Sequence, residues 1–125
     1  MGAGLYEQEG YDLMAAAFEV YNELGHGFLE DVYQESLERE LTCRSIPFSV
    51  KPSLTIMYKK EPLQKTYFPD LIVHGGIVVE MKAVQHLARE HEAQLLNYLK
   101  ATGKRVGYLL NYGASAGLEW KRMVL

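Results

Sequence analysis

The chain has 125 residues, of which 48% are hydrophobic and 23% are charged, and this length and composition predict a single folded domain over residues 1–125. Its net charge of −3 at pH 7 differs from the basic excess of most nucleic-acid-binding proteins, although cations in the C-terminal half could form one basic face or be ordinary solvated side chains. The single cysteine, Cys43, excludes an intrachain disulfide. No apolar run approaches the roughly 20 residues that span a bilayer, and the N-terminal segment does not resemble a signal peptide. We therefore expect a cytoplasmic protein.

Two helices are expected in residues 8–43. Apolar residues recur at helical spacing over residues 8–24 and again over residues 29–43, and a Gly-His-Gly sequence at 25–27 separates the two runs. The apolar side of the second helix is predicted to consist of Leu29, Val32, Tyr33, Leu37 and Leu41. Alternating apolar residues then predict a strand over residues 48–58.

The second half of the chain is expected to alternate strands with one helix. Residues 65–73 and 77–84 are predicted to form an antiparallel hairpin, so that the strands carrying the charged motif described below span residues 48–84. The later elements are expected at residues 86–101, a helix, and at 105–112 and 118–124, the last two strands of the segment 105–124. This order predicts an α/β domain with a central mixed β-sheet flanked by helices.

Charged residues stand within the apolar strands of the predicted hairpin. If the turn is centred on Gly75, Asp70 lies directly opposite Glu80, whereas a two-residue turn would shift this register by one. In the first register the two Cβ atoms lie about 4.5–5.5 Å apart, and Lys82 points to the same face. The alternate residues, which can face the core, are Leu71, Val73, Val79 and Met81.

Two carboxylates at this separation repel each other unless a cation lies between them. Mg²⁺ is commonly bound by one or two carboxylates, with phosphate oxygens and water completing its shell. Lys82 would then orient the attacking water or offset charge that develops on the phosphate. The structural alternative is an ion pair of Lys82 with Asp70 or Glu80 on a half-exposed hairpin, and the hairpin alone leaves both interpretations open.

The predicted helix after the hairpin carries a polar stripe at three- and four-residue spacing. In this stripe Gln94 could hydrogen-bond a phosphate or a metal-bound water, and Tyr98 could donate to substrate or hold Lys82. The structural alternative is that Gln94 is solvated and Tyr98 packs on the sheet. We interpret His86 and His91 as surface histidines and not as metal ligands.

Glu30 lies in the first turn of the second predicted helix. An acidic residue there complements the helix dipole, which is a sufficient structural explanation. In the functional interpretation Glu30 is a third carboxylate beside the metal, and Tyr33, one turn later, packs beneath it or bonds to it.

With these residues, the chain resembles the GxxExxY family of small bacterial and archaeal proteins, which is placed in the PD-(D/E)xK nuclease superfamily with a restriction-endonuclease-like fold. The resemblance covers residues 24–48, 67–84 and 91–113. The naming motif is carried by Gly27, Glu30 and Tyr33, and the superfamily's metal motif by Asp70, Glu80 and Lys82. The remaining matches are Gln94 and Tyr98 to the Gln-x-x-x-Tyr element of exonuclease-like branches, and Glu30 to the acidic residue of their first core helix.

The resemblance implies a nuclease core, and we expect a Mg²⁺-dependent nuclease, with Mn²⁺ as a possible substitute, whose substrate is nucleic acid and is expected to be DNA. The implied metal ligands are Asp70, Glu80 and, directly or through water, Glu30. The implied catalytic set also includes Lys82, Gln94 and Tyr98, whereas Gly27 and Tyr33 have structural roles. The alternatives are a non-catalytic module that binds nucleic acid or a protein, and a scaffold that assembles through its nine tyrosines. Since a small nuclease core gains reach by pairing, we also expect a homodimer.

Overall fold

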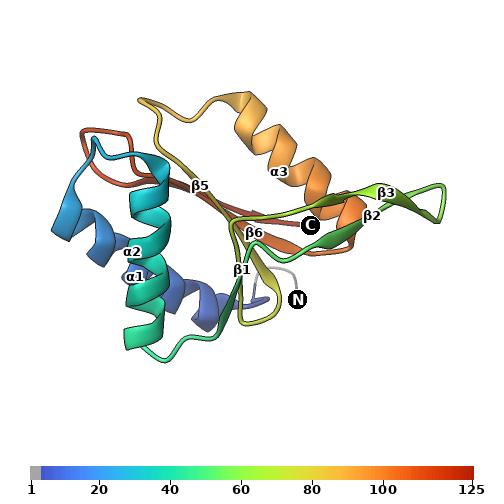
Figure 1. The fold of residues 1–125 in the computed structure, drawn as a ribbon, viewed down its shortest axis with the longest axis horizontal. Helices are drawn as coiled ribbons and strands as arrows, with labels where there is room; N and C mark the ends of the chain where they lie inside the picture. The colour runs from blue at the N-terminus through green and yellow to red at the C-terminus, as the bar shows by residue number, and fades with distance from the viewer. Residues whose placement is uncertain (1–3) are drawn as a thin grey trace.

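Three helices cover the two faces of a five-stranded sheet in the computed structural model, which describes residues 4–125 (Figure 1). The helices are α1 (Glu7–Leu24), α2 (Glu30–Cys43) and α3 (Arg89–Thr102). The strands are β1 (Phe48–Val50), β2 (Leu54–Tyr58), β3 (Glu61–Tyr67), β4 (Leu71–Val73), β5 (Ile77–Lys82), β6 (Val106–Asn111) and β7 (Glu119–Val124). No helix in this described part of the chain is long and apolar enough to cross a membrane.

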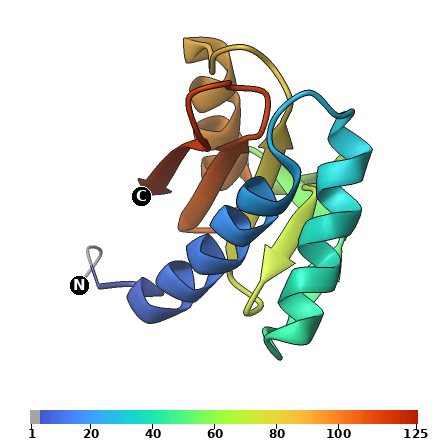
Figure 2. The ribbon, with the colours of Figure 1, turned by 90° about the vertical axis from the view of Figure 1, so that its left-hand side faces the viewer.

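The large sheet has the strand order β1-β4-β5-β6-β7. Strands β5 and β6 are parallel and are connected through α3, while the other neighbouring pairs are antiparallel. In Figure 2, α1 crosses in front of the sheet and α3 lies behind it. The predicted α/β domain with a central mixed sheet and flanking helices is therefore confirmed.

Both faces of the central strands are buried, because each face has its own core. The core under α1 and α2 includes the four residues of β4 and β5 that the hairpin pattern assigned to it, Leu71, Val73, Val79 and Met81. The core under α3 is smaller and is formed by Tyr67, Ile72, Val78, Leu95, Leu99 and Leu109. Strands buried on both faces are nearly continuous in apolar residues, so a charged side chain in β5 has to lie near the end of the strand.

Two predicted strands are each divided in the structure. The segment 48–58 contains β1 and β2, and the segment 65–73 contains the end of β3 and all of β4. Strands β2 and β3 pair with each other in a separate two-stranded sheet. Each division coincides with a proline, Pro52 or Pro69, which has no N–H to donate to a ladder, so the chain leaves one sheet and enters the other there.

Smaller corrections concern helix boundaries and faces. The helix expected from residue 86 begins at Arg89, since the preceding backbone is engaged elsewhere: the Leu87 N–H donates to Glu119 Oε1 at 2.9 Å. Leu29 and Val32 do not face the core, with 80% and 38% of their surface exposed. Leu29 precedes the helix as its N-cap, so its side chain does not continue the buried stripe.

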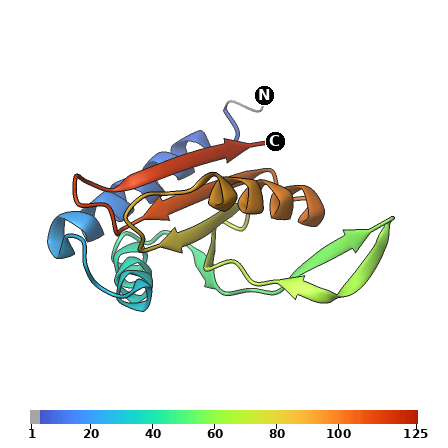
Figure 3. The ribbon, with the colours of Figure 1, turned by 90° about the horizontal axis from the view of Figure 1, so that it is seen from above.

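Strands β2 and β3 extend away from the rest of the molecule, as Figure 3 shows. We call residues 54–67 the β2–β3 arm. Its base packs on α3, because Leu54 and Ile56 join the core that Tyr67 shares with α3. Its outer part, from Met57 to Lys65, is exposed.

Candidate active site

The hairpin register brings Asp70 and Glu80 together. Leu71 pairs with Val79 and Val73 with Ile77, which is the register expected for a turn centred on Gly75. One step beyond the ladder, the Asp70 N–H donates to Glu80 Oε1 at 3.2 Å. In return, the Asp70 carboxylate accepts the Met81 N–H at 2.7 Å. The Glu80 carboxylate is thus fixed to the backbone of Asp70, and the Asp70 carboxylate to the backbone of Met81, the residue after Glu80, where β4 has ended.

The other Glu80 oxygen is held by a tyrosine from the β2–β3 arm. The Tyr67 hydroxyl donates to Glu80 Oε2 at 2.5 Å. The Tyr67 ring stacks on Tyr98 of α3, with ring centroids 3.9 Å apart. Tyr98 therefore contacts Tyr67, which in turn contacts the carboxylate pair. Gln94 lies one turn earlier on the same helix, and its side chain is exposed.

Burial raises the pKa of Glu80 to about 7, although the Tyr67 hydrogen bond lowers it, and the nearby Asp70 charge raises it further. Burial and the Glu80 charge raise the pKa of Tyr67 as well, so this phenol stays a hydrogen-bond donor. Because burial and the Asp70 charge disfavour the ionised form of Glu80, a bound cation would stabilise that form.

Glu30 lies at the start of α2, where the charge of Asp70 acts on it. Burial raises the pKa of Glu30, Asp70 raises it further, and Lys82 and Lys51 lower it. Asp70 and Lys82 therefore lie close enough to Glu30 for their charges to act on it, and we call the three residues one electrostatic neighbourhood. Glu30 is exposed, and Asp70 and Lys82 are partly exposed, so all three side chains are accessible from solvent.

The loop before α2 determines where Glu30 lies. Gly27 has φ +111°, a conformation that favours glycine. The buried Tyr33 hydroxyl donates to the Gly25 carbonyl at 2.6 Å and accepts the Phe28 N–H at 3.2 Å. The partner of this hydroxyl is therefore the loop and not Glu30. In the Gly-x-x-Glu-x-x-Tyr pattern, Gly27 and Tyr33 thus fix the conformation of the loop that precedes Glu30. We call these two residues the loop clamp.

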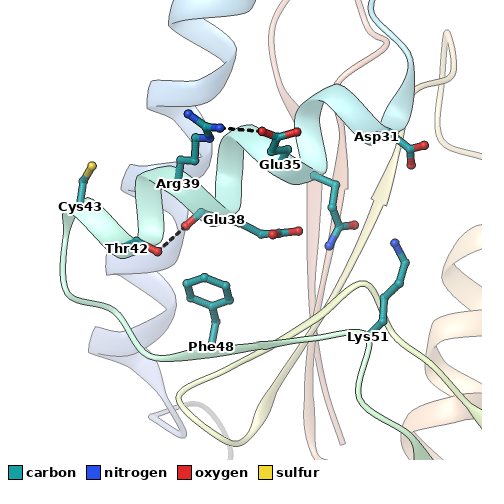
Figure 4. A pocket seen from close by; sticks show the side chains of 9 residues that line it. Asp31, Glu35, Glu38, Arg39, Thr42, Cys43, Phe48 and Lys51 are labelled. Atoms are coloured by element: carbon teal, nitrogen blue, oxygen red, sulfur yellow. Dashed lines mark hydrogen bonds and ion pairs between the residues drawn. The ribbon is translucent and has the colours of Figure 1, made fainter.

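Three residues around the carboxylates were not singled out from the sequence. Besides Tyr67, the Gln34 side chain donates from Nε2 to the Asp70 carbonyl at 2.9 Å, and the Lys51 N–H donates to the same oxygen at 3.1 Å. Figure 4 shows the Lys51 side chain pointing toward the first turn of α2, where Asp31 lies. Gln34 had a recognisable signal, since it is a polar residue next to Tyr33 on the buried side of a helix.

The carboxylate pair fits a magnesium ion better than a metal that needs several side chains. Within residues 4–125 no three His, Cys, Asp or Glu side chains are grouped closely enough to bind a metal together. Mg²⁺ typically takes one or two carboxylates and completes its shell with water and phosphate oxygens. Asp70 and Glu80 meet this requirement, because each carboxylate has lone pairs beyond those used in the hydrogen bonds above. Glu30 would then act through a water molecule.

Glu80→Gln should stabilise the metal-free protein more at pH 8 than at pH 5. The pKa of Glu80 is about 7 in the folded chain, above its ordinary value of 4.5, so the folded state holds the proton more tightly and loses stability as pH rises between these values. Removing the charge should therefore raise the free energy of unfolding by on the order of 2 kcal/mol at pH 8 and by little at pH 5. Urea unfolding in EDTA measures both values. Glu35→Gln, at an exposed residue of α2, is the control, and an equal gain at both pH values would contradict the assignment.

Comparisons with known proteins agree with this geometry. A model of the PD-(D/E)XK nuclease superfamily matches residues 7–123. Among solved structures, the chain is similar to the one described as "Crystal structure of SSO0001", with a TM-score of 0.58 and 20% sequence identity over 95% of this chain and 60% of that chain. At this identity the similarity shows the fold alone, and the chain spans about 60% of the length of that protein. No curated protein matches the sequence.

Proposed function

We propose that this chain, which belongs to the PD-(D/E)XK nuclease superfamily, hydrolyses phosphodiester bonds in nucleic acid, and in DNA in preference to RNA, with Mg²⁺ or Mn²⁺ as cofactor. The observation that carries the proposal is the pair formed by Asp70 and Glu80, in which Glu80 accepts the Asp70 N–H and Asp70 accepts the N–H of Met81, the residue after Glu80. Glu30 and Lys82 lie in the same electrostatic neighbourhood.

In this proposal Asp70 and Glu80 hold the metal ion, which when bound polarises a phosphoryl oxygen and lowers the pKa of water. Lys82 acts on the phosphate or on the attacking water, since an ammonium group has donors and no lone pair for a metal. Tyr67 is a positioning residue that fixes the Glu80 carboxylate. Glu30 orients water from the start of α2.

Gln94 and Tyr98 are proposed to orient substrate from α3. Tyr98 would do so indirectly, because its ring stacks on Tyr67. Gln94 is exposed beside it and can reach a phosphate oxygen. The loop clamp formed by Gly27 and Tyr33 supports the narrower proposal that the chain is a GxxExxY protein, since it explains why these two residue types accompany Glu30.

A non-catalytic module that binds nucleic acid or protein on the same fold is the second candidate. It is favoured by the finding that Glu30, Asp70 and Glu80 do not form a closed three-carboxylate metal site in the described chain. A homodimer also remains a proposal, and light scattering that gives only a 14.2 kDa species at high concentration would exclude it.

One experiment separates the two candidate functions. Labelled single- and double-stranded DNA and RNA are incubated with the protein in Mg²⁺, Mn²⁺ or EDTA, and Mg²⁺ binding is measured by calorimetry. The nuclease proposal expects cleavage that EDTA abolishes and a metal site that Asp70→Asn removes. If no substrate is cleaved and no such site exists, the binding module replaces the nuclease.

A further inference from the structure

The β2–β3 arm is connected directly to the carboxylate pair. Tyr67, the last residue of the arm, donates to Glu80, and the chain reaches Asp70 three residues later. The base of the arm is fixed on α3 by Leu54 and Ile56. The base of the arm therefore lies at the candidate active site while its outer part extends away from the body (Figure 3), so a long molecule bound along the arm would also approach the site.

The arm and its approach form a basic segment of an acidic chain. Residues 51–67 contain four lysines and one acidic residue, Glu61, so this segment has a net charge of +3. The whole chain has a net charge of −3, and the remaining residues therefore sum to −6. Three of these lysines, Lys59, Lys60 and Lys65, are exposed on the part of the arm that extends from the body. Positive charge is concentrated where a polyanion could be gripped.

The tip of the arm carries its charge in an unfavourable conformation. Lys59 and Lys60 form the turn between β2 and β3 with φ values of 49° and 67°. Both central residues of a type I′ turn need positive φ, which Asn-Gly adopts best and which is unfavourable for a residue with a long side chain. Lys59 Nζ lies 5.6 Å from the centroid of the Tyr58 ring, which is itself 60% exposed. The tip thus combines two ammonium groups with an exposed aromatic ring.

The opposite side of the site has more carboxylates than cations. The groove between α2 and β1 is lined by Asp31, Glu35 and Glu38, together with Lys51 and with Arg39, which pairs with Glu35 at 2.9 Å (Figure 4). These carboxylates would repel a phosphate backbone, since like charges raise the free energy of close approach. A nucleic acid that reaches Asp70 and Glu80 is therefore guided toward the arm.

We propose that the β2–β3 arm enters the major groove of duplex DNA and contacts its phosphates through Lys59, Lys60 and Lys65, so that a phosphodiester is presented to the carboxylate pair. This inference rests on the proposed function and names its substrate as duplex DNA. The major groove of B-DNA admits a two-stranded β-ribbon, whereas the major groove of an RNA duplex is too deep and narrow for side chains to read.

The variant Lys59→Asn with Lys60→Gly tests the arm, because it removes two charges while giving the turn the residues that favour it. Fluorescence anisotropy of a labelled DNA duplex in EDTA should show about a tenfold loss of affinity, and the slope of log K against log[salt] should become shallower by about 1–2. The melting temperature should stay the same or rise. The matched control, Arg39→Gln with Lys121→Gln, removes two charges from α2 and β7 and should keep affinity near that of the unmodified protein.

The outcomes separate this inference from the proposed function. Three results would contradict the proposed role of the arm. These are unchanged DNA affinity in the arm variant, an equal loss of affinity in the control, and tighter binding to an RNA duplex than to a DNA duplex. Cleavage in Mg²⁺ should show a raised KM with kcat nearly unchanged in the arm variant, because the carboxylates are intact. If the arm variant loses DNA binding but the unmodified protein cleaves nothing, the arm is a DNA-binding element and the nuclease proposal fails.

Discussion

Asp70→Asn is expected to eliminate Mg²⁺ binding and to reduce cleavage by at least on the order of 10³-fold without unfolding the protein. The structural part of the Asp70 side chain survives the change, because an amide oxygen can still accept the Met81 N–H now bound at 2.7 Å. What is lost is the negative charge, which a divalent cation needs. Calorimetry with Mg²⁺, the cleavage rate and the melting temperature give the three readouts.

Lys82→Ala is the contrasting variant for this prediction. An ammonium group near the carboxylate pair opposes the binding of a cation, so its removal should leave Mg²⁺ affinity similar or higher. The cleavage rate should nevertheless fall by about 10²–10³, the scale for one preorganised electrostatic group. If Asp70→Asn retains cleavage, or if Lys82→Ala loses the metal, the assigned roles are wrong.

The position of the carboxylate pair was predictable from the sequence because it depends on local geometry. Of the two registers that the turn chemistry left open, the structure has the one centred on Gly75, with Leu71, Val73 and Val79 on the larger core. That register places Asp70 beside Glu80 without any knowledge of the remaining fold. Helix ends depend on equally local signals, and the end of α1 at Leu24 was predictable from Gly25, which is the C-cap.

The division of strands among sheets was not predictable, because strand pairing is a contact between distant residues. Residues 48–58 alternate as one strand should, and Pro52 alone does not say that the chain changes sheets there. The arm was therefore missed, and with it the role of Tyr67. Tyr67 approaches Glu80 only because the base of the arm packs on α3, where the Tyr67 ring stacks on Tyr98.

Gly113→Ala is expected to destabilise the protein by about 2–4 kcal/mol, because the added methyl group would meet backbone that cannot move aside. A Cβ at Gly113 would lie 2.3 Å from the Val84 carbonyl oxygen and 2.4 Å from its nitrogen. The two segments are also held together, since the buried Asn111 side-chain oxygen accepts both the Val84 and the Gly113 N–H groups at 3.0 Å.

This contact connects stability to the active site, because Val84 follows Lys82 by two residues and the Lys82 carbonyl accepts the Tyr112 N–H at 2.9 Å. Pushing Val84 away should therefore displace the end of β5 and slow cleavage even where the variant remains folded. Gly4→Ala is the control, since nothing lies within 4 Å of a Cβ added there, and its free energy of unfolding should stay within about 0.5 kcal/mol of the unmodified protein. Urea unfolding of both variants measures the difference, and equal stabilities would show that the backbone around Val84 yields more easily than its hydrogen bonds to Asn111 indicate.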